Sequence, residues 1–505
     1  MKTIAKTFAF GVLLAAIGCG GGGGKVDNPS GKGGPKGPTT ATGEAVSKGA
    51  EDAFNVAIEA FAQHEVASDW NDASCADVAK KFEAATSQQK TGKFPEATYN
   101  AGLVWQRCSN DKEATARFKQ AIADDPNSHA ARAQLALYQF KADGNVDAAI
   151  GEMQRAVLDS KFQNIPALVD LAMLQMIRDG ASGGDGCKDD LECAKKNLQR
   201  ALAVDDSYMP AFNQLALYYF KQAKKRAGAV KSTGLKRGRE IATNAAMGKR
   251  ADVQQLELAA LVCSQAIRKN AKYAPIHNTA GLIQNELGQI NGAVGEFKTA
   301  AALDPKFFEA QMNFAFVNLS FRGFENAQQA LERAVAMQPN DYDAHLGLAL
   351  ALRGQITDVN FDKILPMVQS ELAKAKQIDA NRPDAYYNEG ILVQEYEAKA
   401  GGDKTKTIAA YDKAKGIFQQ FLDKSQGKPE YEGAVKRTKE RMQDMEDIKQ
   451  FLLIPDAPTT PPPSTPPAGA TEGAPPNAGQ AGANPAPAPG GAAGGGAPPA
   501  QPPKK

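Results

Sequence analysis

The segments GLIQNELGQINGAVGEFKTAAALDP (281–305) and AFVNLSFRGFENAQQALERAVAMQP (315–339) align without a gap, 34 residues apart. Both contain small, small, bulky, small and proline residues at equal offsets: Gly281, Ala293, Phe297, Ala300 and Pro305 in the first, Ala315, Ala327, Leu331, Ala334 and Pro339 in the second. Small residues let two helices cross closely, and proline stops a helix because it lacks an N–H and has a fixed φ. The pattern therefore predicts one pair of packed helices per repeat.

The same offsets recur on both sides of these segments. The residues that fit them are Gly102, Ala114, Phe118, Ala121 and Pro126 in a close copy, and Ala136, Ala149, Met153, Ala156, Ala172, Ala194, Leu198, Ala201, Ala216, Ala259, Cys263, Ala266, Ala349, Ala375, Gly390, Ala414, Phe418 and Phe421 in weaker copies. The pattern resembles the tetratricopeptide (TPR) family, which has small residues at positions 8, 20 and 27, a bulky residue at 24 and often proline at 32. The resemblance implies an all-α, TPR-type helical solenoid, a right-handed superhelix of roughly eight repeats. A coiled coil is excluded because Gly and Pro interrupt any run of heptads.

The chain divides into six predicted regions. Both ends are poor in hydrophobic residues and rich in Gly and Pro, which predicts disorder, whereas the Ala- and Leu-rich body favours helices. The boundaries are 1–18 for a signal peptide, 19–43 for a flexible linker, 44–94 for N-terminal helices, 95–428 for the repeats with insertions near 179–189 and 221–255, 429–454 for a capping helix, and 455–505 for a disordered Pro-rich tail.

The first residues predict export and lipidation. A short basic segment precedes an apolar run (8–17), which has the length of a signal-peptide core and is too short to span a bilayer. The run ends in AIGC (16–19), which resembles the lipobox of bacterial lipoproteins and implies acylation of Cys19. Gly20, in place of aspartate, implies by the enterobacterial sorting rule an outer-membrane protein, lipid-anchored and facing the periplasm. The alternative is an ordinary signal peptide with a chance cysteine.

The sequence predicts no catalytic residue, metal, cofactor or small-molecule substrate. Of the four histidines, no two have the i, i+4 spacing of a metal pair on one helix. His277 and His345 fall at position 4, where the family usually has a large side chain, so we interpret them as packing residues. No phosphate-binding loop, nucleophile elbow or HExxH motif is present. We therefore expect a protein that binds partners and is not an enzyme.

The charge gives no indication of nucleic-acid binding. The formal net charge is +2, and the strongly basic insertion at 221–255 has no interleaved aromatic residues on which bases could stack. We interpret this insertion as a solvated helix extension. The alternative is a contact with an acidic protein or an anionic envelope polymer.

The remaining cysteines fit an oxidising compartment. Cys187 and Cys193 bracket the insertion of one repeat, and Cys75 and Cys108 lie in neighbouring predicted helices, so each pair is a possible disulfide. Cys263 occupies the bulky position 24 of its repeat and is interpreted as a buried thiol.

The expected binding surface is the groove lined by the first helix of each repeat. In the TPR family positions 2, 5, 9 and 12 of this helix line the groove. Here positions 5 and 9 predict an apolar surface with a few polar groups, suited to an amphipathic helix or an extended peptide. The candidates are Tyr99, Leu103, Asn213, Leu217, Asn278, Leu282, Met312, Phe316, Leu350, Tyr387 and Ile391. The alternative is that the aliphatic side chains only pack against the second helix of their own repeat.

The layout of the whole chain resembles the TPR lipoproteins of the myxobacterial gliding-motility (Glt) complex. The resemblance implies a scaffold that binds protein partners of the cell envelope within an envelope-spanning motility and trafficking machine. Two alternatives stay open: an assembly lipoprotein for a secretion or pilus pore, and an activator of a peptidoglycan enzyme.

Overall fold

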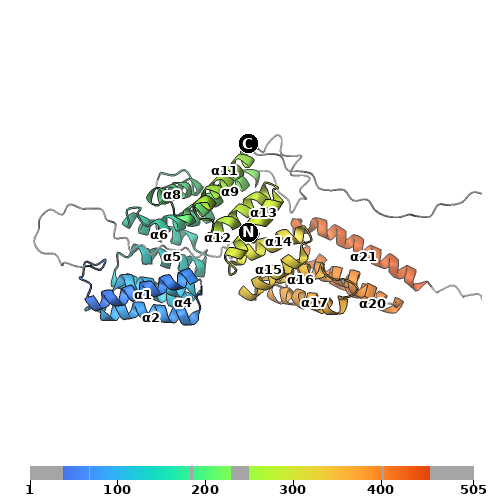
Figure 1. The fold of residues 1–505 in the computed structure, drawn as a ribbon. Helices are drawn as coiled ribbons and strands as arrows, with labels where there is room; N and C mark the ends of the chain where they lie inside the picture. Colours follow the sequence, from blue (N-terminus) through green and yellow to red (C-terminus); the bar gives the residue numbers. More distant parts are fainter. Residues whose placement is uncertain (1–37, 68, 182–185, 229–249, 401–402, 455–505) are drawn as a thin grey trace, which may run out of the picture. The chain divides into compact units, whose positions relative to one another are not determined.

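A computed structural model describes residues 38–67, 69–181, 186–228, 250–400 and 403–454 (Figure 1). Their helices pack in consecutive pairs: α1 (Lys48–Ala67) with α2 (Asp72–Gln88), α3 (Pro95–Arg107) with α4 (Asp111–Asp124), α5 (His129–Asp143) with α6 (Val146–Asp159), α7 (Ile165–Arg178) with α8 (Asp190–Val204), α9 (Met209–Gly228) with α11 (Arg250–Lys269), α12 (Ala274–Glu286) with α13 (Ile290–Leu303), α14 (Phe308–Ser320) with α15 (Phe324–Met337), and α16 (Tyr342–Arg353) with α17 (Phe361–Ile378). The fold is the predicted all-α, TPR-type solenoid. We number the pairs from α3–α4 to α16–α17 as repeats one to seven, and call the two helices of a repeat helix A and helix B.

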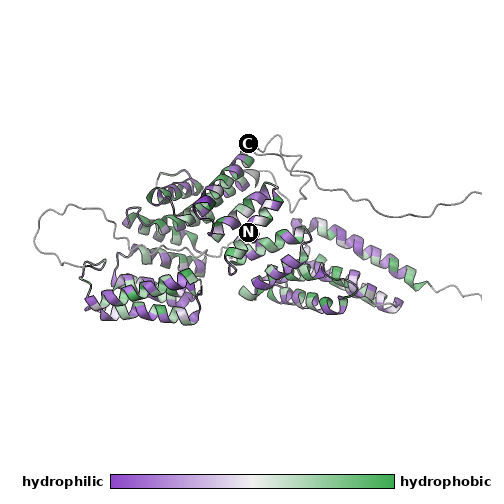
Figure 2. Cartoon of the chain, viewed as in Figure 1, coloured by the Kyte–Doolittle hydropathy of each residue, from purple (hydrophilic) through white to green (hydrophobic). Residues whose placement is uncertain are grey.

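Repeat eight is irregular. Its helix A begins as α18 (Asp384–Leu392) and continues through a π-helical turn (Val393–Glu397) and α19 (Ala398–Ala400), and its helix B is α20 (Lys404–Ser425). A 3-10 turn (Pro429–Tyr431) then leads into α21 (Glu432–Leu453), a helix on which hydrophilic residues predominate (Figure 2). Met445 of α21 is buried in one apolar cluster with Ile391 and Phe418, so this helix covers the end of repeat eight.

The residue at position 24 matches the residue at position 8 in size. Where position 8 is glycine, position 24 is phenylalanine, and a Cβ atom on the glycine would lie 2.5–2.6 Å from a ring carbon. The three such pairs are Gly102–Phe118, Gly281–Phe297 and Gly390–Phe418. Where position 8 is alanine, position 24 is smaller: Met153, Leu198, Cys263, Leu331 or Leu372. Because a packed interior has no spare volume, glycine is the residue that makes room for the ring.

The side chain at position 4 of helix A stabilises the turn between two repeats by a hydrogen bond. In five repeats this side chain hydrogen-bonds to the backbone carbonyl six residues earlier, in the turn that follows the preceding helix B. The pairs are Arg132 with Pro126 (2.9 Å), His277 with Ala271 (2.9 Å), Gln311 with Pro305 (3.4 Å), His345 with Pro339 (2.9 Å) and Tyr386 with Ala380 (3.2 Å). These bonds supply partners for carbonyl groups that no helix satisfies.

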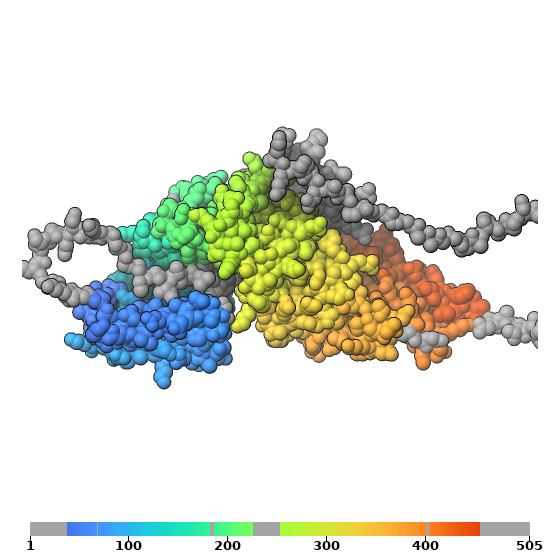
Figure 3. Space-filling view, in the orientation of Figure 1, coloured from blue at the N-terminus to red at the C-terminus, as the bar shows by residue number. Residues whose placement is uncertain are grey.

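The structure shows that helices occupy both ends of the predicted insertion at 221–255. Residues 221–228 belong to α9 and residues 250–255 to α11, because their Lys, Gln and Ala residues favour helix. The stretch between these helices lies outside the described residues, as do Cys19 and the tail from 455 onward. Within the described ranges, no helix is long and apolar enough to cross a membrane. The repeats follow one another in sequence order, so that the yellow surface of α14 and α15 continues into the orange surface of repeats seven and eight (Figure 3).

Candidate functional site: the surface of helices A

The eleven predicted groove residues divide by exposure. Phe316 is 41% exposed. Six others are half-buried: Tyr99, Asn213, Leu217, Leu282, Leu350 and Tyr387. Four are buried: Leu103, Asn278, Met312 and Ile391. The structure therefore leaves seven of the candidates at least partly open to a partner.

Packing inside and between repeats explains three of the four buried candidates. Leu103 shares an apolar cluster with Phe118 of its own helix B, Ile391 shares one with Phe418, and Met312 lies in the large cluster of repeats six and seven. For these residues the prediction of an accessible groove position is wrong, and the alternative of packing holds. Sequence offsets place a residue on a helix face, but they do not show how far a neighbouring repeat covers it.

Polar side chains at position 6 join the helices A of neighbouring repeats. Each is hydrogen-bonded to a polar side chain on the preceding helix A, either at position 5 or near the C-terminal end. The four bonds are Gln106 Nε2 to Gln134 Oε1 (3.2 Å), Thr279 Oγ1 to Asn213 Oδ1 (2.7 Å), Asn313 Nδ2 to Asn278 Oδ1 (2.9 Å) and Arg353 Nη1 to Asn388 Oδ1 (3.0 Å). Asn213 and Asn278, predicted as polar groups of the groove, therefore also act as acceptors between repeats.

Asp170 interrupts this ladder of hydrogen bonds. It occupies position 6 of repeat three, but position 5 of repeat two is Ala133, which has no polar group. Asp170 is 4% exposed, and none of the described residues donates a hydrogen bond to its carboxylate. Burial raises the pKa of Asp170 to about 7, as expected for a carboxyl group that loses water and gains no partner.

Two tyrosines lie within electrostatic range of Asp170. Burial raises the pKa of Tyr99 and of Tyr208, and the negative charge of Asp170 raises both further. Tyr208 is 7% exposed, and its hydroxyl has no hydrogen-bond partner among the described residues. Tyr99 is only half-buried, so the cluster of Tyr99, Asp170 and Tyr208 has one side near the solvent.

A second aspartate of repeat three is fully paired. Asp190, 0% exposed, accepts hydrogen bonds from Arg178 Nε (2.7 Å) and Nη2 (2.6 Å) and from the backbone N–H of Gly180 (2.7 Å). Burial by itself would raise the pKa of Asp190, but the bonds from Arg178 and Gly180 hold it below its ordinary value. The Arg178–Asp190 pair thus ties both ends of the 179–189 connection together.

The structure contains both cysteine pairs. Cys75 is bonded to Cys108, with Cα atoms 6.4 Å apart, and Cys187 is bonded to Cys193, with Cα atoms 5.4 Å apart. The first disulfide links α2 to the end of α3, and the second holds the 179–189 connection to the start of α8. Cys263 is a buried free thiol, and burial raises its pKa to about 12, so it remains protonated and unreactive.

His277 and His345 make the same polar contacts in two repeats. Besides the turn carbonyl, each ring contacts a glutamate of its helix B: His277 Nδ1 lies 2.7 Å from Glu296, and His345 Nδ1 lies 2.6 Å from Glu371. Nε2 must carry a proton, because it donates a hydrogen bond to the carbonyl oxygen of the turn. The contact between Nδ1 and the glutamate therefore requires one further proton, held between Nδ1 and the carboxyl group. These histidines are therefore hydrogen-bonding residues as well as packing residues, which the sequence did not indicate.

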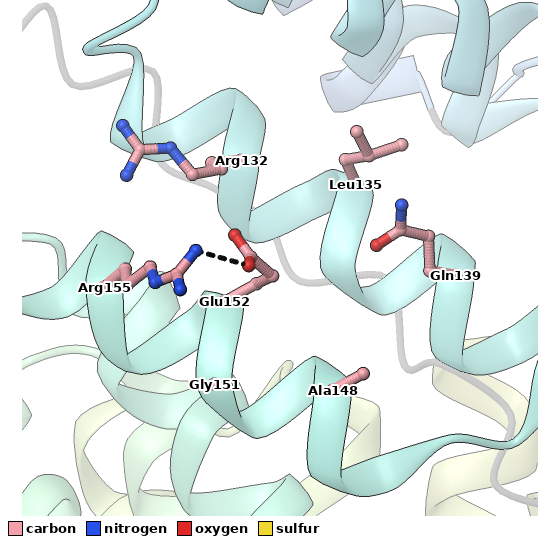
Figure 4. Close-up of a pocket in the computed structure, with 7 residues that line it drawn as sticks. All are labelled: Arg132, Leu135, Gln139, Ala148, Gly151, Glu152 and Arg155. Carbon is pink, nitrogen blue, oxygen red and sulfur yellow. Dashed lines mark hydrogen bonds and ion pairs between the residues drawn. The ribbon is translucent and has the colours of Figure 1, made fainter.

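The described repeats include two hollows of similar volume. One, of about 470 Å³, lies between α5 and α6, and the ion pair of Arg155 with Glu152 (2.8 Å) lies on its α6 side (Figure 4). Its lining is Arg132, Leu135, Gln139, Ala148, Gly151, Glu152 and Arg155. The other, of about 460 Å³, lies beside α17 and includes His345 and Lys374. Across the described ranges, His, Cys, Asp and Glu side chains form no group of three that could hold a metal ion.

The basic residues at the end of α9 are partly neutralised. Lys225 Nζ lies 2.7 Å from Asp179 and Lys224 Nζ lies 2.7 Å from Glu286. These pairs join repeat four to repeats three and five. The described part of the basic insertion therefore contributes to contacts between repeats.

No protein-family model matches the sequence, and no curated protein matches it. Solved TPR structures resemble parts of it. A thermophilic TPR protein of Thermus thermophilus, TTC0263, is 25% identical over 45% of this chain and 100% of its own, with a TM-score of 0.34. YrrB, described as a TPR protein with an unusual peptide-binding site, is 18% identical over 45% of this chain and 96% of its own, with a TM-score of 0.31. The pilF protein of Pseudomonas aeruginosa is 16% identical over 51% of this chain and 95% of its own, with a TM-score of 0.33. At such scores the TPR-type assignment rests on the helix pairs of the chain itself.

Proposed function

We propose that the chain is an outer-membrane-anchored TPR scaffold lipoprotein that binds protein partners in the periplasm and does not catalyse a reaction. The observation that supports binding is the set of half-buried or exposed side chains on the helices A of repeat one and repeats four to eight, with Phe316 the most exposed. Repeats of one geometry offer a partner a continuous surface. The lipobox-like AIGC ending at Cys19 supports the anchor.

The finer proposal is a role in an envelope-spanning motility and trafficking machine, which rests on the layout of lipobox, linker, repeats and Pro-rich tail. Assembly of a secretion or pilus pore, and activation of a peptidoglycan enzyme, are the alternatives. The identity of the bound partner distinguishes these three roles.

A photoreactive amino acid placed at Phe316 tests partner binding in intact cells. Val359, which is 98% exposed but belongs to the connection between α16 and α17 and not to a helix A, is the matched control. We expect a discrete adduct from position 316 and none from 359, with mass spectrometry identifying a motility, pore or peptidoglycan protein. Equal labelling from both positions would refute the proposed surface.

Cys19→Ala tests the anchor. The acylated chain should fractionate with the outer membrane. The variant should become soluble, because it lacks the cysteine that carries the acyl chains on which stable anchoring depends. Cys263→Ala removes a buried thiol instead and should leave the fractionation unchanged. A Cys19→Ala protein that stays firmly in the membrane fraction would show that lipid does not anchor the chain.

A further inference from the structure

The cluster of Tyr99, Asp170 and Tyr208 contains polar groups that have no hydrogen-bond partner among the described residues. The carboxylate of Asp170 and the hydroxyl of Tyr208 are each more than nine-tenths buried, and neither forms a hydrogen bond with the described residues. Most buried polar atoms in folded proteins have a hydrogen-bond partner, and an ionised carboxylate without one is among the most costly exceptions.

Other repeats show that the fold could have paired this group. Thr279 and Asn313, at position 6 like Asp170, bond to an asparagine at position 5 of the preceding repeat. Repeat two has Ala133 instead, and repeat three has the one position-6 side chain that carries a charge. An acid therefore stands where the neighbouring repeat supplies no donor.

We infer that Asp170 and Tyr208, with Tyr99 at the open edge, form a binding site for the ammonium group of a lysine side chain from a protein partner. This inference rests on the proposed function, because it assigns a chemistry to the partner that the helix A surface binds. A carboxylate is the natural acceptor for an ammonium group, and phenol rings attract cations through their faces.

The recessed position of Asp170 favours lysine over arginine and over a metal ion. Lysine places a compact charge at the end of a thin, flexible stem, whereas the guanidinium group of arginine is a wide planar fork. A metal ion would require several ligands, and the described residues offer no group of three suitable side chains. Half-buried Tyr99 marks the side from which the stem would enter.

Titration of the full chain with pentylammonium chloride, a mimic of the lysine side chain, tests the site without any partner. A ligand that binds only the folded chain raises Tm. Above pH 7 we expect pentylammonium to raise the Tm of the wild type and 1-pentanol, its neutral counterpart, to give no such rise. Asp170→Asn should weaken binding about tenfold or more, and Tyr208→Phe, which removes only the unpaired hydroxyl, should weaken it less.

Asp179→Asn is the control variant, because Asp179 lies in the same repeat but is already paired with Lys225. It should bind pentylammonium like the wild type. Equal Tm shifts in the wild type and in Asp170→Asn, or no shift beyond that of 1-pentanol, would overturn the inference. Neither outcome affects the cross-linking test at Phe316, so failure of the site and failure of the proposed function remain distinguishable.

Discussion

Asp170 and Asp190 belong to the same repeat and are almost equally buried, 4% and 0% exposed, yet their carboxyl groups behave in opposite ways. Asp190 accepts bonds from Arg178 and from the N–H of Gly180, and its pKa lies below the ordinary value. Asp170 accepts none from the described residues, and its pKa is raised to about 7. Burial is common to both, so the donors decide the charge state.

The two aspartates give the repeat opposite responses to pH. The folded pKa of Asp190 is depressed, so its contribution to stability is present above the unfolded value near 3.8 and is lost as pH falls further. The pKa of Asp170 in the folded chain is raised from 3.8 to about 7. The contribution of this group to the stability of the fold is therefore fully present below pH 3.8, the pKa in the unfolded chain, and is lost as the pH rises to about 7. Near neutral pH, Asp190 stabilises repeat three while Asp170 destabilises it.

The largest expected effect comes from removing hydrogen-bond donors from Asp190, so that its buried carboxylate loses its partners and comes to resemble that of Asp170. Arg178→Ala removes two of the three hydrogen bonds to a fully buried carboxylate and should destabilise repeat three by about 3–5 kcal/mol. Native-state hydrogen exchange should show the loss in the amides of α7 and α8, because solenoid repeats contact only their neighbours. Asp147→Ala removes only the exposed partner of Arg178 and should cost less than about 1 kcal/mol. A similar loss in both variants would mean that the buried pair has no special weight.

The second effect has the opposite sign and comes from removing the charge of Asp170. Because burial raises the pKa of Asp170 from 3.8 to about 7, ionising this group in the folded chain above pH 7 costs on the order of 4 kcal/mol. Asp170→Asn avoids that cost, but its unpaired amide returns about 2 kcal/mol of it at every pH, so the variant should be more stable than the wild type by about 2 kcal/mol at pH 8 and less stable by about 1–2 kcal/mol near pH 4. The phenols of Tyr99 and Tyr208, whose pKa values are raised, stay neutral over this range. Urea unfolding at both pH values measures the difference, and a gain that is independent of pH would contradict the assignment.

Features confined to one repeat were predictable from the sequence. The offsets of Gly281, Phe297 and Pro305 indicated two closely crossing helices and their end, and the structure adds that glycine at position 8 accompanies phenylalanine at position 24. Both rules follow from local volume and backbone chemistry, which a sequence displays directly.

Features that depend on a neighbouring repeat were not predictable. Leu103 and Met312 have the spacing of groove residues, but packing buries them. The lack of a partner for Asp170 among the described residues depends on Ala133 in another repeat, and no offset within repeat three shows it. The only available signal was an aspartate at a position where the other repeats have uncharged residues, namely Asn, Gln, Thr or Gly.

The smallest expected effect comes from an uncharged hydrogen bond between two neighbouring helices A, whose contribution to stability should not depend on pH as the contributions of the two aspartates do. Asn278→Ala removes the acceptor of Asn313 and should cost about 1 kcal/mol, the usual net value of one neutral hydrogen bond. Because neither amide ionises, the loss should be the same at pH 5 and pH 8, in contrast to the change at Asp170. Urea unfolding at the two pH values measures it. Asn381→Ala, at an exposed asparagine, is the control and should change stability by less than about 0.5 kcal/mol. A pH-dependent loss at Asn278 would mean that an ionisable group contributes to this hydrogen bond, and the contrast between charged and neutral position-6 residues would then be wrong.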